Sequence, residues 1–394
     1  MIRLASSIGF LLLVCVLSAT AQKPSTFLLN GALLQANKTQ IAQGNAALLA
    51  ARKKVLANAD KLLSKPAHSV VEKTKMPPSG DKHDYMSVGP YWWPDSTKAN
   101  GLPYIRKDGQ INPERYAVQD ETYLKAMCEE VQQLAVAYYF SDDEKYARKA
   151  ADLLRVWFLN PATHMNPNLN YGQAIPGITE GRGIGLIDTR MFAKLVDAVQ
   201  LLKGSKAWTN KEHAALQGWF RQFLDWMMMS PIGKDEEDEH NNHGTYYDVQ
   251  AVAIALFLDD KGLAKQIIEQ KTLKRIQSQL KEDGSQPHEL ARTLTWGYSV
   301  MNLKGFFGLA QLAENVNIDL WNYETADGKS LKKAYFWMLP YADQTKPWTF
   351  QQIKTPNFDE FTTVKAIASQ KYKQGDATVL PGQDSLFALT RSLF

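Results

Sequence analysis

Apolar side chains recur every three or four positions along most of the chain, which is the spacing of one face of an α-helix. One run begins at Glu121 and contains Leu124, Met127, Val131, Leu134, Ala135 and Tyr138. A second run follows the polar start signal at 141–143, stops at Asn160-Pro161, and contains Tyr146, Ala147, Ala150, Leu153, Leu154 and Trp157. Two such runs joined by a short turn predict an antiparallel helical hairpin.

The helical period returns through the rest of the chain. It predicts further helices at residues 192–202, 216–227, 247–257, 263–280, 290–313 and 331–341. Alternating runs of β-branched residues, which mark half-buried strands, are scarce. No repeat of fixed length indicates a tetratricopeptide or ankyrin array. The pattern therefore predicts an all-α protein, an α/α toroid that is an incomplete or closed barrel of antiparallel helical hairpins.

Two long segments lack the helical period. Residues 73–116 are rich in Pro, Gly, Asp and aromatic side chains, and residues 164–188 are also irregular. Long irregular segments inside a helical domain usually carry function, so we expect both as loops that cover one end of the toroid. No Ser-, Gly- or Pro-rich linker divides the chain, and residues 22–394 are expected to form a single domain.

The N-terminus has the features of an export signal. Arg3 gives a positive start, residues 8–17 form an apolar core, and a small-residue cleavage site precedes Gln22. Cys15 does not follow a small residue, so we expect no lipoprotein signal. We expect a cleaved signal peptide at 1–21 and a periplasmic or secreted protein. No later apolar run approaches the length of a membrane span, so no membrane contact is expected after cleavage.

Composition narrows the choice of partners. The formal net charge is +4, from 45 Lys and Arg against 41 Asp and Glu, which does not indicate nucleic-acid binding but allows a local basic surface for a polyanion. Aromatic residues make up 11% of the chain and can offer flat faces to sugar rings. Without the signal, Cys128 is the one remaining cysteine, which excludes an intramolecular disulfide. A second copy of the chain, in a homodimer packed through an exposed aromatic loop, is a further candidate partner.

The densest group of chemically capable side chains lies at residues 239–248, where two amides, two imidazoles and two phenols occur together. Asn242 and His243 are the candidates for catalysis. In the alternative interpretation, Asn242 caps the next helix and the histidines lie at the surface. A metal site is a further alternative, with ligands drawn from Asp235, Glu236, Glu237, Asp238, His240 and His243. The usual metalloprotease spacing and its glutamate base are missing, so no metal is expected.

A second candidate group lies at residues 288–298, at the head of a predicted helix. Arg292 and Tyr298 are six positions apart, so an ideal helix would place them some way round from each other. Both can then border one cavity only near its rim or floor. The alternative interpretation is a salt-bridge arginine and a core tyrosine.

Together the two groups suit β-elimination from a uronate. The proton on carbon 5 becomes acidic only when the neighbouring carboxylate is neutralised, and Asn242 and Arg292 can do this as hydrogen-bond donor and cation. His243 suits the base that takes the proton, and Tyr298 suits the acid that protonates the leaving oxygen. Where both atoms lie on one face, as in mannuronate, a deprotonated Tyr298 could serve as base and then acid. On opposite faces, as in guluronate, the two residues must divide the work.

The chain resembles the alginate lyase superfamily of helical toroid lyases, especially polysaccharide lyase families five and thirty-eight. The resemblance is carried by the run DYMSVGPYWWPD at 84–95, by GLPY at 101–104 with DGQINPE at 108–114, by MNPNLNYGQ at 165–173, and by the Asn242-His243 pair. It implies that an Asn-His pair, an arginine and a tyrosine form the active centre, and these are Asn242, His243, Arg292 and Tyr298. Tyr247 is the rival acid. The resemblance also implies an anionic polysaccharide substrate, alginate or glucuronan, and no required cofactor or metal.

The irregular segments supply candidate substrate contacts. Trp92 and Trp93 are adjacent, so at most one is expected to face the substrate. Gln173 and Arg182 lie in a Gly-rich stretch and could contact hydroxyls or a neighbouring carboxylate. The expected substrate-binding residues are Tyr85, Trp92, Trp93, Gln173, Arg182 and Tyr247.

The predicted function is a polysaccharide lyase that cleaves alginate or a related polyuronate and leaves a 4,5-unsaturated uronate end. One alternative is a glycoside hydrolase on the same toroid, which needs two carboxylates several ångströms apart. Asp188, Glu180 and Asp248 are its candidates, and they form no recognisable pair. The other alternative is a non-catalytic glycan-binding protein that holds polymer on its aromatic loops. Preference for mannuronate, guluronate or glucuronate, and internal or terminal cutting, depend on loop geometry.

Overall fold

The computed structural model describes residues 23–372 and 385–393. Its helices are α1 (Gly31–Ala42), α2 (Ala46–Leu62), α3 (Asp120–Ser141), α4 (Glu144–Leu154), α5 (Phe192–Gln200), α6 (Asn210–Met229), α7 (Pro231–Glu237), α8 (Asn242–Phe257), α9 (Lys261–Ile267), α10 (Leu273–Gln279), α11 (Pro287–Leu290), α12 (Thr295–Glu314), α13 (Leu331–Ala342), α14 (Thr362–Tyr372) and α15 (Ser385–Thr390). The expected signal peptide lies outside the described residues. None of the described helices is both long and apolar enough to cross a membrane.

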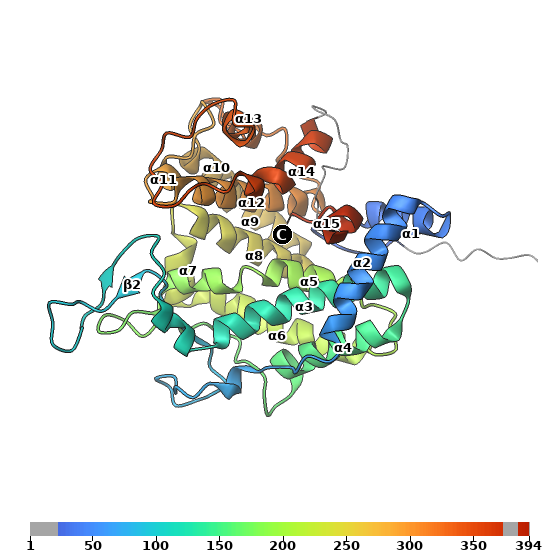
Figure 1. Cartoon of the computed structure of the whole chain (residues 1–394), viewed down its shortest axis with the longest axis horizontal. Coiled ribbons are helices and arrows are strands. Elements are labelled where there is room, and N and C mark those ends of the chain that lie inside the picture. The colour runs from blue at the N-terminus through green and yellow to red at the C-terminus, as the bar shows by residue number, and fades with distance from the viewer. Residues whose placement is uncertain (1–22, 373–384, 394) are drawn as a thin grey trace, which may run out of the picture.

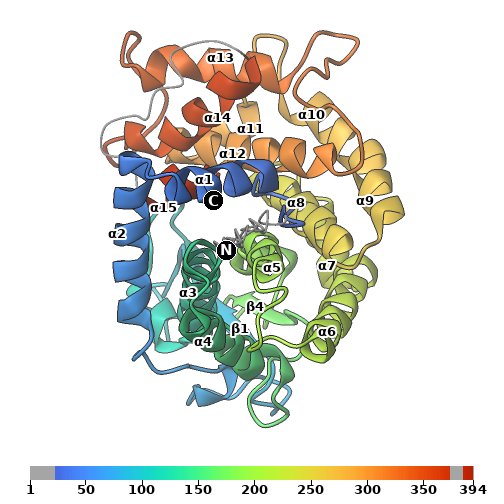
Figure 2. The same cartoon turned by 90° about the vertical axis from the view of Figure 1, so that its right-hand side faces the viewer.

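Helices packed in sequence order form a ring, which Figure 2 shows from one end. The inner helices α3, α5, α8 and α12 each pack against the next, while α2 and α4 cover α3, and α6 and α9 cover α8. Every residue of α8 except His243 is buried, as expected for a helix surrounded by protein. Helices α1 and α15 contact each other and α2. The all-α toroid of paired helices is thereby confirmed.

The predicted helices are found, but several differ from the expectation in their bounds. The helix expected at 290–313 begins only at Thr295, because residues 291–294 leave the helical path to meet a distant loop. Leu294 forms an isolated bridge with Gln352, and the Ile353 N–H donates to the Thr293 carbonyl at 2.9 Å. The segment expected as a helix at 263–280 contains a π-helical turn between α9 and α10. Helices α1, α2, α7, α11, α14 and α15 were not predicted.

The two irregular segments meet at one end of the toroid, where Figure 1 shows an arm projecting at left. They contain the short strands β1 (Met86–Val88), β2 (Trp92–Trp93), β3 (Ile105–Arg106) and β4 (Tyr171–Ala174). Strand β1 pairs with β4 in parallel, and β2 pairs with β3 in an antiparallel hairpin. Within the second segment, a Cβ on Gly185 would lie 2.5 Å from the Gly172 backbone. Glycine is therefore needed at position 185.

A buried ion pair fixes the first segment to the toroid. Lys73 Nζ lies 3.0 Å from Asp120 Oδ2, and both side chains are 1% exposed. The same carboxylate oxygen accepts the Met86 N–H of β1 at 3.0 Å. Asp120 opens α3, so the strand pair is anchored to an inner helix.

Candidate active site

The Asn242-His243 pair opens α8, at the end of the toroid that carries the arm. Asn241 is the N-cap, and its side chain accepts the His243 N–H at 2.9 Å. Position 244, directly after His243, must be glycine, because a Cβ on Gly244 would lie 2.1 Å from both Arg275 Nη1 and the Glu239 carbonyl oxygen. Asn241 therefore has the capping role that the alternative interpretation gave to Asn242.

Arg275 of α10 holds the segment before the pair against α8. Its guanidinium forms an ion pair with the fully buried Asp248, at 2.8 Å from Nε to Oδ2. The same group donates to the carbonyls of Glu237 and Glu239, at 2.7 and 3.0 Å. One buried cation thus fixes both the helix and the chain that enters it.

His243 is oriented by a buried carboxylate from α7. Its Nδ1 lies 2.9 Å from Glu236 Oε1, and the two side chains are 14% and 0% exposed. Burial raises the pKa of Glu236 to about 7. Burial lowers the pKa of His243 because it disfavours the charged imidazolium. The neighbouring Glu236 carboxylate has the larger effect, and the pKa of His243 is raised above its usual value. With Nδ1 occupied by Glu236, Nε2 is the nitrogen that can accept a proton.

Asn242 is held by a second buried carboxylate, Glu289 of α11. Its backbone N–H donates to Glu289 Oε1 at 2.6 Å, and its Nδ2 donates to Oε2 at 2.9 Å. This contact uses one of the two amide hydrogens of Nδ2, so the other can serve a substrate. Glu289 connects the two predicted groups, because its own carbonyl accepts the Arg292 N–H at 3.2 Å.

Arg292 and Tyr298 lie face to face. The guanidinium carbon is 3.9 Å from the centre of the phenol ring, within the range of a cation–π contact. Asp108 accepts from Arg292 at two atoms, at 3.2 Å from Nε and 2.8 Å from Nη2. Burial raises the pKa of Asp108, but its hydrogen bonds with Arg292 outweigh this and hold that pKa well below its usual range. The Nη1 hydrogens are not used in this pair and face no competing carboxylate in it.

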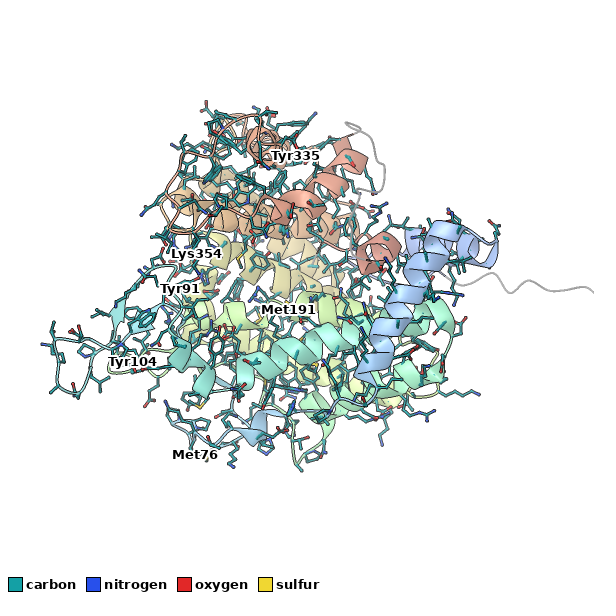
Figure 3. All side chains as sticks on the ribbon, in the orientation of Figure 1. Met76, Tyr91, Tyr104, Met191, Tyr335 and Lys354 are labelled. Carbon is teal, nitrogen blue, oxygen red and sulfur yellow. The ribbon has the colours of Figure 1, made fainter. Side chains whose placement is uncertain are left out.

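The Tyr298 hydroxyl lies 2.7 Å from the hydroxyl of Tyr91, which immediately precedes β2. Burial raises the pKa of Tyr298, the neighbouring Tyr91 adds to this, and the phenol is protonated at neutral pH. Figure 3 shows Tyr91 at the base of the arm, with Lys354 close to it in that view. The four predicted catalytic residues thus belong to one cluster, linked through Glu289 and through the Arg292 to Tyr298 contact.

Three of the predicted substrate-binding residues, Gln173, Arg182 and Trp92, form a second group beside this cluster. Gln173 is 4% exposed and donates to Asp188 at 2.9 Å, while its Oε1 accepts from Arg182 at 3.0 Å. The Arg182 guanidinium lies 5.8 Å from the centre of the Trp92 ring. Trp93 instead donates to the Gln110 carbonyl at 3.0 Å. The two tryptophans therefore have different neighbours, and Trp92 is the one beside Arg182.

Two of the expected substrate contacts, Tyr85 and Tyr247, have buried side chains. Tyr85 is 0% exposed, and its hydroxyl donates to Asp188 at 3.0 Å. Tyr247 is 3% exposed, and its hydroxyl donates to the Met227 carbonyl at 3.0 Å. Each phenol thus has a protein partner in the core, and the partner of Tyr247 is a backbone carbonyl outside the cluster.

The carboxylates named for hydrolysis do not share a site. Asp248 is occupied by Arg275, and Asp188 is buried against Tyr85, Ser87 and Gln173. Within residues 23–372 and 385–393, no three His, Cys, Asp or Glu side chains are grouped so as to hold a metal ion. The geometry favours neither the hydrolase nor the metal alternative.

Sequence reasoning missed four partners, Tyr91, Asp108, Glu236 and Glu289. Glu236 was considered only as a metal ligand. Asp108 and Glu289 lie in stretches that the sequence had singled out, at 108–114 and 288–298. Tyr91 precedes the Trp92-Trp93 pair, but its partner is 207 positions away, so only the fold brings the two phenols together.

Comparison with known proteins shows the family of the chain. Residues 69–348 match the model of a family described as alginate lyase. An alginate lyase from Bacteroides ovatus has a similar crystal structure, with 40% identity, a TM-score of 0.86, and coverage of 93% of this chain and 95% of that chain. A histidine-to-alanine variant of alginate lyase A1-III in complex with a tetrasaccharide has 15% identity, a TM-score of 0.62, and coverage of 95% and 96%, which supports the fold alone. No curated protein sequence matches the chain.

Proposed function

The chain belongs to the alginate lyase family, and from this premise we propose that it cleaves alginate by β-elimination at the cluster of Asn242, His243, Arg292 and Tyr298. It is a polysaccharide lyase that acts on an anionic polysaccharide and leaves a 4,5-unsaturated uronate end. The observation that carries the residue assignment is that each of the four side chains has its own partner. Those partners are Glu289, Glu236, Asp108 and Tyr91.

Neutralisation of the uronate carboxylate is the first requirement. Asn242 keeps one amide hydrogen beyond its bond to Glu289, and Arg292 keeps Nη1 beyond its pair with Asp108. Both would donate to the carboxylate, where negative charge grows as the carbon 5 proton leaves. Because the donors are already held in place, little reorganisation is needed in the transition state.

The proton transfers are divided between His243 and Tyr298. His243 Nε2 takes the carbon 5 proton, and the new imidazolium is stabilised by Glu236. The electron pair forms the double bond between carbons 4 and 5 as the bond from carbon 4 to oxygen breaks. The leaving oxygen takes the proton of the Tyr298 hydroxyl. The raised pKa of Tyr298 favours this acid role over a resting phenolate base.

This division suits substrates whose proton and leaving oxygen lie on opposite faces, as in guluronate. After each cycle, a proton passes from the imidazolium to the phenolate through solvent and restores both groups. A mannuronate substrate would require Tyr298 to act twice. Comparison of rates on poly-guluronate and poly-mannuronate therefore tests the division, which predicts the faster reaction on poly-guluronate.

Incubation with alginate tests the reaction class. A lyase produces a conjugated double bond that absorbs in the near ultraviolet, whereas a glycoside hydrolase produces reducing ends without that absorbance. A non-catalytic binding protein produces neither. Full activity is expected after dialysis against a chelator. Loss of activity would support the metal alternative.

Two further parts of the proposal concern the whole protein. Export would be tested by N-terminal sequencing of the chain recovered from the periplasm or medium, with Gln22 as the expected first residue. Homodimer formation through the arm would be tested by the molecular mass in solution. The apolar side chains Leu102, Ile105 and Ile178 are 37%, 40% and 54% exposed, which supplies an apolar surface for such a contact.

A further inference from the structure

A polar pocket lies at the end of the toroid opposite the cluster. This end of the toroid faces the viewer in Figure 2. It has a volume of about 840 Å³, within the range of roughly 300 to 1,000 Å³ typical of ligand sites. Leu256 and Phe257, at the C-terminal end of α8, line it, as does Asn315, the C-cap of α12. Sixteen residues of α8 span about 24 Å, so this pocket is separate from the site at Asn242.

Two buried side chains in the pocket wall have polar atoms without a partner. Gln200 is 4% exposed and His213 is 9% exposed, and both line the pocket. Gln200 Oε1 and His213 Nε2 accept or donate no hydrogen bond among the described residues. A buried polar atom without a partner costs free energy of about 1–3 kcal/mol, so these atoms are explained most simply by a ligand that satisfies them.

The chemical character of each atom is set by its surroundings. His213 Nδ1 accepts the Trp208 indole N–H at 3.3 Å. Burial, with the nearby charge of Lys203, lowers the pKa of His213 to about 4, so the ring is neutral at physiological pH. Its one hydrogen is therefore on Nε2, which is a donor, whereas Gln200 Oε1 is an acceptor.

A pocket wall that offers both a donor and an acceptor selects against an anion that can only accept hydrogen bonds. Sulfate oxygens, for example, would accept from His213 but have no hydrogen to donate to the Gln200 oxygen. A sugar hydroxyl can accept from one and donate to the other. The half-buried Phe27 and the amides of Asn210 and Gln217 add the apolar face and polar groups that a pyranose ring uses.

The charges at the rim select an acidic sugar. The charged side chains that line the pocket, apart from His213, are Lys23, Lys203 and Lys261 against Asp259. Lys203 and Lys261 are exposed, so their ammonium groups can reach a carboxylate that sits at the mouth. We propose that this pocket binds a uronate residue, whose hydroxyls meet His213 and Gln200 and whose carboxylate meets the two lysines. The choice of a uronate among acidic sugars rests on the proposed function.

Calorimetric titration of the full chain with sodium D-mannuronate tests this site. Wild type should bind the monosaccharide, and the Lys203→Gln/Lys261→Gln variant should bind it about tenfold more weakly or worse, because charge-assisted contacts to the carboxylate are lost. Both lysines are exposed, so this variant should fold normally. Arg292→Gln, which alters the opposite end, should keep this binding event. His213→Phe should also lose it while preserving the volume of the ring.

Three control ligands complete the titration. D-Mannose lacks the carboxylate, and sodium acetate and inorganic phosphate lack the sugar ring, so each should bind much more weakly than mannuronate. The proposal is overturned if wild type does not bind mannuronate, if the lysine variant binds it as wild type does, or if acetate or phosphate binds equally well. Near-ultraviolet absorbance on alginate, measured on the same preparations, reports the proposed function separately, because the lysine variant should retain that activity.

Discussion

The two ends of α8 differ in how their polar groups are satisfied. At its N-terminus, every catalytic candidate has a protein partner, as His243 has Glu236 and Asn242 has Glu289. At its C-terminus, His213 and Gln200 line a pocket with atoms that have no partner in the described part of the chain. The buried helix α8 therefore has the candidate catalytic cluster at its N-terminal end and the proposed ligand-binding pocket at its C-terminal end.

This difference reflects what each end must do. A catalytic group works only in a fixed orientation and protonation state, so a second residue must hold it before substrate arrives. A binding pocket gains affinity when the ligand supplies hydrogen bonds that the protein lacks. Substitutions at the first end should therefore change turnover, and substitutions at the second should change binding alone.

The largest expected effect is that of Tyr298→Phe. Removal of the hydroxyl takes away the acid for the leaving oxygen, and kcat on alginate should fall by about a hundredfold to ten-thousandfold. Tyr247→Phe is the matched control, because it removes a buried hydroxyl that bonds only to the Met227 carbonyl. Equal losses in both variants would show that a general loss of packing, rather than acid catalysis, is responsible.

Arg275→Met should have the next largest effect, on stability. It leaves the fully buried Asp248 without its cation, and unpaired buried charges cost about 3–5 kcal/mol in the free energy of unfolding. Lys271→Met is the control, because Lys271 pairs with Glu237 at the surface, where such pairs contribute about 1 kcal/mol or less. Thermal unfolding of both variants measures the difference, and a similar Tm for the two would contradict the role given to Arg275.

Glu236→Gln should shift the pH dependence of turnover. His243 must be neutral to accept a proton, so kcat falls as the pH drops through its pKa, which Glu236 raises. Removal of the carboxylate charge lowers that pKa, and the acid limb should move to lower pH by about one to three units. Glu239→Gln should move it less, because Glu239 acts on His243 at longer range without a hydrogen bond. An acid limb that stays in place or moves upward would exclude His243 as the base.

The smallest expected effect is at the opposite end. Lys203→Gln/Lys261→Gln should change kcat on short alginate oligomers by no more than about twofold, since exposed substitutions far from a site rarely cost more. A large loss of turnover would show that the two ends are coupled.

The sequence could predict what depends on neighbours along the chain. The apolar period revealed α3 and α8, and the adjacent Asn242 and His243 were recognisable as a pair. It could not predict that the helix expected from residue 290 would start at Thr295, because the cause is a bridge to Gln352 from a loop more than fifty positions later. Helix α2 was missed because its buried stripe consists mainly of alanine and valine among lysines.

The same limit applies to the candidate site. Tyr85 lies in a run of aromatic residues that looked exposed, but the Asp188 side chain reaches it from 103 positions away and holds it in the core. The carboxylates that orient His243 and Asn242 come from α7 and α11. A pattern along one segment does not reveal which side chains arrive from another.

One measurement tests the central claim most directly, namely the near-ultraviolet absorbance and the reducing ends formed from poly-guluronate in the same sample. Wild type should form double bonds and reducing ends in equal amounts, and His243→Ala should form almost none of either while it still binds the polymer. Reducing ends without double bonds, or a fully active His243→Ala variant, would contradict β-elimination at this cluster.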